Sequence, residues 1–197
     1  MPPAFDNLTL WQRVYDHLRD EIMGDRLPPG TELSEVALSR ELAVSRGPIR
    51  EALEVLAVRL AVPGITDAEL AELDKLVDRM SGHAKNGAVG DFFVANVAFH
   101  DLLCKLSGNS KLLEVHRRLA GEIGRFQART LALRGSLDGS VTEHRAILAA
   151  IRLRDADKAA ELTSAHIRVP AQRLRETVGE AGRPGAQMAP DTFTDTA

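Results

Sequence analysis

The sequence predicts an all-α protein, and three observations support this prediction. Apolar residues recur every three or four positions through most of the chain, which is the spacing of a helix face buried in a core. No segment alternates apolar and polar residues as a half-buried strand does. Three Ser/Thr-x-x-Glu/Gln runs, which begin at Thr9, Thr66 and Ser140, have the spacing of helix capping boxes.

The N-terminal part of the chain is predicted to form three helices separated by turns. The first runs from Thr9 to Gly24, and the Pro-Pro-Gly turn at 28–30 precedes a short helix capped by Ser34. Ser45 is expected to cap the third helix. The apolar stripe of that helix continues without a break up to Pro-Gly at 63–64 and comprises Ile49, Ala52, Leu53, Leu56 and Leu60.

Five further helices are expected, followed by a disordered tail over 179–197, where glycine, proline and polar residues predominate. Loops are expected at 81–90 and 135–139, and Pro170 should kink or break the last helix. The five helices are predicted from Thr66 to Met80, from Asp91 to Leu106, from Ser110 towards Leu133, from Ser140 to Ile151 and from Asp155 to Pro170.

Composition restricts the class of protein. The 197 residues are 44% hydrophobic and 27% charged, as in an ordinary globular protein with a real core. No apolar run approaches the roughly 20 residues that cross a membrane, and no secretory signal is visible. The single cysteine, Cys104, suits a reducing compartment, so we expect a cytoplasmic protein. The net charge of −3 argues against a nucleic-acid partner held by bulk electrostatics, although one basic face can still read DNA.

Three histidines and one asparagine fall on the predicted inward faces of three helices. Asn96 and His100 are four residues apart and share a helix face, while His144 and His166 are in line with the apolar residues of their own helices. Neutral imidazoles and an amide oxygen can bind a divalent transition metal such as zinc, nickel or manganese. A hydrogen-bonded polar core is the alternative. Glu143 is assigned to a capping box, and surface or loop positions are predicted for the other histidines, which are His17, His83 and His116.

The layout of residues 10–57 is that of a helix-turn-helix. Ser45, Arg46, Gly47 and Arg50 lie at the start of its second helix, where hydroxyl, backbone N–H and guanidinium groups meet phosphates and guanine edges. The alternative is that both arginines are solvated helix charges, since residues 1–60 carry more acids than bases.

The segment PPGTELSEVALSRELAVSRGPIREAL resembles the helix-turn-helix of GntR-superfamily bacterial transcription regulators. The stretch from Ala52 to about 175 resembles the FCD sensor domain of the FadR-like branch, whose metal ligands match Asn96, His100, His144 and His166, with Asn in place of the more usual Asp. The resemblance implies an antiparallel helical bundle, a bound metal, a small carboxylate effector and a homodimer. It also implies an effector-binding arginine on the first sensor helix, which is Arg50, and Arg59 is the fallback.

The chain departs from the family at the junction of the two parts. In the family, the DNA-reading second helix of the helix-turn-helix is followed by a two-stranded wing and a linker. Here the run from Ile49 to Leu53 fits both that DNA-reading helix and the first helix of the sensor domain. The expected organisation is a truncated helix-turn-helix over 1–57 and a sensor over 58–178, with weakened DNA binding. Two alternatives are an orphan sensor that has lost DNA binding and a metal-dependent hydrolase, although the stripes supply no obvious general base beside the metal.

Overall fold

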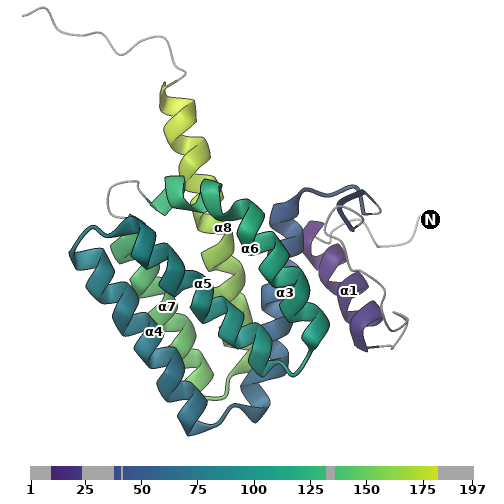
Figure 1. The fold of residues 1–197 in the computed structure, drawn as a ribbon. Helices are drawn as coiled ribbons and strands as arrows, with labels where there is room; N and C mark the ends of the chain where they lie inside the picture. Colours follow the sequence, from purple (N-terminus) through teal and green to yellow (C-terminus); the bar gives the residue numbers. More distant parts are fainter. Residues whose placement is uncertain (1–9, 24–37, 41, 132–135, 182–197) are drawn as a thin grey trace, which may run out of the picture.

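The computed structural model describes residues 10–23, 38–40, 42–131 and 136–181, and within them every regular element is a helix (Figure 1). The all-α prediction is therefore confirmed. The helices are α1 (Leu10–Met23), α3 (Arg46–Ala61), the 3-10 helix η1 (Val62–Gly64), α4 (Asp67–Lys85), α5 (Val89–Leu106), α6 (Ser110–Leu131), α7 (Ser136–Arg152) and α8 (Ala156–Ala181). Among these residues no helix is both long and apolar enough to cross a membrane.

Helix α3 lies at the centre of the molecule. It packs against α8, α1, α5 and α6, and Figure 1 shows it between the α4, α5 and α7 helices on one side and α1 on the other. Ten of its residues, Ile49, Glu51 to Val58 and Ala61, are buried, so this helix has almost no solvated face. A helix in this position has to bury its polar side chains together with its apolar ones.

Two hydrophobic clusters form the core. The first joins α4, α5, α7 and the end of α3, and it includes Phe92, Phe99 and Ile147. The second joins Val14 and Leu18 of α1 to α3 and to buried residues of α5 and α6. The N-terminal helix therefore shares the second cluster with α3, α5 and α6. The predicted domain boundary between residues 57 and 58 lies inside α3.

The junction between the two predicted parts is a single uninterrupted helix. Helix α3 runs from Arg46 to Ala61, as expected from the continuous apolar stripe. Ser45 is its N-cap residue, but its side chain makes no capping hydrogen bond. No hairpin follows the start of α3 in the described part of the chain, because η1 and α4 come directly after it.

Several predicted boundaries are wrong. Helix α4 extends to Lys85 and α5 begins at Val89, so the loop expected over 81–90 shrinks to a tight turn in which Gly87 has a φ of 64°. Helix α7 begins at Ser136, because Leu137 packs on the first core cluster and extends the apolar stripe by one turn. Pro170 lies within α8 and does not end it.

The three predicted capping boxes have different outcomes. The box at Thr66 is present, with reciprocal bonds between Thr66 and Glu69. The box at Ser140 is wrong, because that residue lies inside α7. The predicted start of the tail at residue 179 is wrong, because α8 extends to Ala181. Thr9, the Ser34 cap and residues 182–197 lie outside the described residues.

Candidate metal centre

Three buried histidines from three different helices meet in the interior. His100 is on α5, His144 on α7 and His166 on α8, and their side chains are 2%, 0% and 6% exposed. Each offers one ring nitrogen, and these three atoms all lie within 4.8 Å of one another. The inward-facing stripes therefore bring together the three residues that the sequence singled out.

An oxygen acceptor faces the Nδ1 atom of each ring. His144 Nδ1 lies 2.7 Å from the backbone carbonyl of Ser140, and His166 Nδ1 lies 2.7 Å from Oε2 of Glu143. His100 Nδ1 lies 2.7 Å from Oε2 of Glu54, in a contact that is close but not aligned as a linear hydrogen bond. Oxygens of this kind fix the tautomer of metal-binding histidines in proteins.

These contacts determine which nitrogen carries the proton. A carbonyl and a carboxylate only accept, so Nδ1 of His144 and Nδ1 of His166 donate. The Glu54 carboxylate, 2.7 Å from Nδ1 of His100, favours the proton on that nitrogen as well. Nε2 of the neutral ring then presents a lone pair. Nε2 of His100 and Nε2 of His144 are 3.3 Å apart. When both protons are on Nδ1, two lone pairs at that distance repel each other unless a cation or a shared proton lies between them.

The nitrogen separation fits a shared metal ion. Two ligands at 2.0–2.1 Å from a tetrahedral zinc ion are about 3.4 Å apart, close to the 3.3 Å between His100 and His144. Burial lowers the pKa of His100, and burial together with the neighbouring His166 and His100 holds the pKa of His144 well below its usual range. Both rings are therefore neutral at neutral pH, which is the form that binds metal. The donor set fits a divalent metal.

Asn96 is the remaining predicted ligand. It is 4% exposed and lies one turn before His100 on the same face of α5. Its role as a fourth ligand stays a prediction.

Two charged residues beside the histidines were missed or misplaced by the sequence patterns. Glu54 of α3 is 2% exposed, and its Oε1 lies 2.6 Å from Nε of Arg50. His116 of α6, predicted at the surface, is 3% exposed and lies 3.5 Å from the same carboxylate oxygen. Helical spacing could have located His116, because it is in line with the buried residues Leu112, Val115 and Leu119.

The two groups have opposite charges. Burial alone would raise the pKa of Glu54, but Arg50 and His100 hold it well below its usual range. Burial would lower the pKa of His116, but hydrogen bonds to Asp101 and Glu54 raise it to about 9. At neutral pH Glu54 is therefore an anion and His116 a cation.

The predicted DNA-contacting and effector-binding residues lie in different environments. Ser45, Arg46 and Gly47 are exposed at the start of α3. Arg50 is 11% exposed and is paired with Glu54. Arg59 is 44% exposed, pairs with Asp157 and lies over the Tyr15 ring, which places it on the side of α3 that faces α1.

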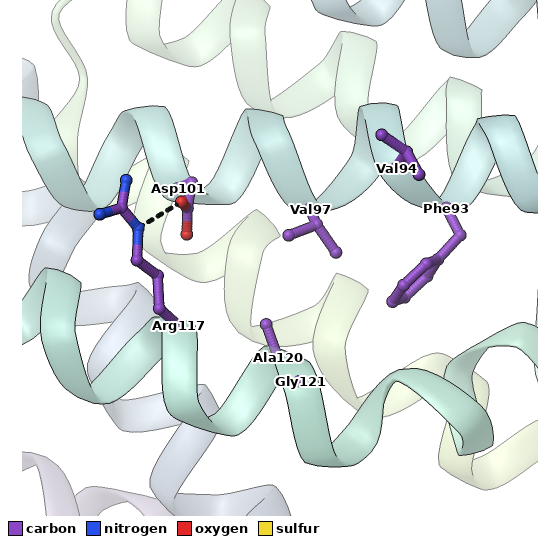
Figure 2. Close-up of a pocket in the computed structure, with 7 residues that line it drawn as sticks. All are labelled: Phe93, Val94, Val97, Asp101, Arg117, Ala120 and Gly121. Carbon is purple, nitrogen blue, oxygen red and sulfur yellow. Dashed lines mark hydrogen bonds and ion pairs between the residues drawn. The ribbon is translucent and has the colours of Figure 1, made fainter.

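A surface hollow of about 260 Å³ lies between α5 and α6 and is separate from the histidine cluster (Figure 2). Its walls are largely apolar, with Phe93, Val94 and Val97 from α5, and the Asp101–Arg117 ion pair lies at one end. These α5 residues are at least partly exposed, whereas His100 is on the buried face. The hollow is therefore not part of the metal centre.

Family models match both parts of the chain. The model of the FCD domain matches residues 48–169, and that of the bacterial regulatory proteins of the gntR family matches residues 10–62. These matches define the class as bacterial transcription regulators with an N-terminal helix-turn-helix and an FCD domain. The chain belongs to the gntR family of bacterial regulatory proteins, in the branch that carries an FCD domain.

Individual relatives agree with this assignment. The chain is 26% identical over 186 residues to the gluconate operon transcriptional repressor of Bacillus licheniformis, covering 74% of this chain and 76% of that protein. It is 21% identical over 202 residues to the transcriptional repressor RspR of Escherichia coli, covering 84% and 89%. The solved structure of E. coli McbR/YncC has the same fold, with a TM-score of 0.59 at 20% identity, covering 87% of this chain and 99% of that one.

Each of these two sequence alignments has more positions than the number of residues that this chain contributes to it. For the gluconate repressor, 74% of 197 residues is about 146, whereas the alignment has 186 positions. For RspR, 84% is about 165 against 202 positions. Roughly 40 positions of each alignment thus have no counterpart here, and the two family models overlap at residues 48–62, within α3. Both findings agree with a shortened junction between reader and sensor.

Proposed function

We propose that this chain is a ligand-responsive regulator whose sensor domain binds a divalent metal through His100, His144 and His166. The proposal includes a homodimer in the cytoplasm, as in the sequence-based prediction. The relatives are regulators, which favours this function over the metal-dependent hydrolase. The observation that carries the proposal is the pair of facing Nε2 atoms, 3.3 Å apart, on two neutral rings.

The metal would be held by the three imidazoles, with the Asn96 amide oxygen as a weaker fourth ligand. An amide is neutral, so affinity is expected to be lower than with an aspartate at that position. When bound, the dication supplies a Lewis-acidic position to which a ligand oxygen can attach.

Metal analysis of protein purified without a histidine tag tests this site. We expect one zinc, nickel or manganese ion per chain after incubation and dialysis, and a loss of at least tenfold in affinity in His100→Ala. His83→Ala, which changes a histidine on α4 outside the cluster, is the matched control. Occupancy near zero in the wild-type protein with every metal would contradict the proposal.

The effector is proposed to be a small organic acid bound to the metal. A carboxylate beside a dication in a dry site is strongly favoured. Arg50 and Arg59 were the predicted helpers, and both guanidinium groups make ion pairs, with Glu54 and Asp157 respectively. We therefore assign the main share of effector binding to the metal.

Calorimetry with di- and tricarboxylates and sugar acids, in the presence and absence of a chelator, tests the effector proposal. We expect heat of binding only with metal present. Binding that survives the chelator would show that the acid is held by the protein alone, and Arg50→Gln and Arg59→Gln would then identify the arginine.

We also propose that DNA binding by this chain is weak. A wing adds phosphate contacts, and each lost contact lowers affinity and flattens its salt dependence. The continuous α3 leaves no residues for a hairpin between its start and the sensor. Arg50 is held by Glu54, so three exposed residues, Ser45, Arg46 and Gly47, remain for DNA at this helix start.

A gel-shift assay with the gene's own upstream DNA tests this at low and physiological salt. The comparison is a version in which a wing and linker from a related regulator are inserted before the sensor. We expect the restored version to bind at least tenfold more tightly. Equal nanomolar binding by the two proteins at physiological salt would refute the proposal, and no binding by either would favour the orphan sensor.

A further inference from the structure

We infer that Glu54 of α3 is a positioning residue for the metal, acting through His100. The inference rests on the proposed metal site. It adds to that site a fourth helix, α3, which carries no predicted metal ligand but carries the exposed N-terminal residues Ser45 to Gly47.

The side chains of Glu54 and His100 face each other in the interior of the protein. Oε2 of Glu54 lies 2.7 Å from Nδ1 of His100, and both side chains are 2% exposed. Neither atom has another hydrogen-bond partner among the described residues. The gap beside them, bounded also by Ala57 and Cys104, leaves no room for a water molecule. The carboxylate is thus the group that keeps the proton of His100 on Nδ1.

Arg50 and His116 keep the Glu54 side chain in this place. Arg50 Nε holds Oε1 at 2.6 Å, and His116 approaches the same oxygen at 3.5 Å, so Oε2 is left to face His100. On the far side of His116, Nδ1 lies 2.9 Å from Oδ1 of Asp101. Asp101 also pairs with Arg117 at 2.7 Å. Each of the two anions therefore has a cationic partner, which is the condition for keeping charges away from water.

An anion behind a ligand histidine has two effects on the metal. It fixes the ring so that Nε2 points at the ion, and it makes that nitrogen a stronger electron donor. Carbonyl and carboxylate partners of this kind are each worth about 10–100-fold in metal affinity. Glu54 therefore increases affinity without touching the ion.

The test compares zinc affinity, by competition with a chromophoric chelator, and the cobalt absorption spectrum in four full-length proteins. These are the wild type, Glu54→Gln, the double variant Arg50→Gln with Glu54→Gln, and Glu51→Gln. The double variant removes the charge imbalance that could unfold the single one. Glu51 is the matched control, because it is also buried on α3 but its described partners lie outside the histidine cluster. Its Oε1 accepts a hydrogen bond from Ser164 at 2.6 Å and lies 3.4 Å from Nε of Arg168.

We expect zinc to bind about 10–100 times more weakly to both Glu54 variants, with altered cobalt bands, and to bind Glu51→Gln within threefold of wild type. If the double variant regains normal stability and also normal zinc affinity, Glu54 only supports the fold and the inference is overturned. If the wild-type protein itself binds neither zinc nor cobalt, the metal site fails, and the inference with it.

Discussion

The first turn and the middle of helix α3 hold their polar side chains in opposite ways. At the first turn Ser45, Arg46 and Gly47 are exposed, and Ser45 makes no capping bond. Two turns later Glu54 is almost completely buried among Arg50, His100 and His116. The same helix therefore has an exposed first turn and a middle whose polar side chains are buried with those of three other helices.

This difference separates two kinds of function. A surface helix start can lose DNA contacts without any cost to packing, because water replaces the partner. Removal of one member of a buried polar cluster lowers the free energy of unfolding, because the remaining groups stay desolvated and lose their partner. We therefore expect substitutions around the buried middle of α3 to change the free energy of unfolding, and substitutions in its exposed first turn to change DNA binding.

The largest expected effect is stabilisation of the protein by metal. Free zinc at about 1,000 times its dissociation constant should add about 4 kcal/mol to the free energy of unfolding, because only the folded state presents the converged site. His144→Leu should abolish this gain. Urea unfolding with and without zinc measures it, and His83→Leu on α4 serves as the control. A gain that survives in His144→Leu would mean that the metal binds elsewhere.

The next effect is the pH dependence contributed by His116. Its pKa is raised from 6.5 to about 9 in the folded protein. The folded state therefore holds the proton more tightly than the unfolded state. This stabilisation is complete below pH 6.5 and is lost as the pH rises through 9. The shift corresponds to at most about 3 kcal/mol.

Urea unfolding of chelator-treated protein at a series of pH values between 6 and 10 checks this prediction. His116→Gln should flatten the decline between pH 6.5 and 9, and His83→Gln should not. An unchanged slope in His116→Gln would show that the pair with Asp101 and Glu54 does not keep this ring charged.

The residues around the buried middle of α3 also differ in how far the sequence predicted them. The three metal-site histidines were found because each is in phase with an apolar stripe. His116 was predicted at a surface or loop position, whereas it is in line with the buried residues Leu112, Val115 and Leu119. An error of one residue in phase rotates a helix face by about 100°.

The burial of Glu54 and its contact with His100 could not be predicted from the same patterns. An arginine and a glutamate four residues apart, such as Arg50 and Glu54, ordinarily form a solvated helix pair. Here α3 is surrounded by α1, α5, α6 and α8, so the pair is buried by neighbours far away in the sequence. Glu143 was missed for a related reason, because the Ser140 capping box offered a local role and the true partner, His166, lies on another helix.

The smallest effect on stability is expected at the exposed end. Arg46→Ala should change the free energy of unfolding by less than about 0.5 kcal/mol, as at most surface sites, whereas Ile49→Ala, one turn later and fully buried, should lower it by about 2–5 kcal/mol.

In the wing-restored protein, Arg46→Ala should also flatten the plot of log affinity against log salt by about one unit if this side chain meets a phosphate. Gel shifts between about 50 and 200 mM salt cover the range over which that slope is measured. An unchanged slope together with relaxed base preference would instead assign Arg46 to a base edge. A large loss of stability in Arg46→Ala would contradict the contrast between the first turn and the buried middle of α3, because the first turn would then contribute to the stability of the fold.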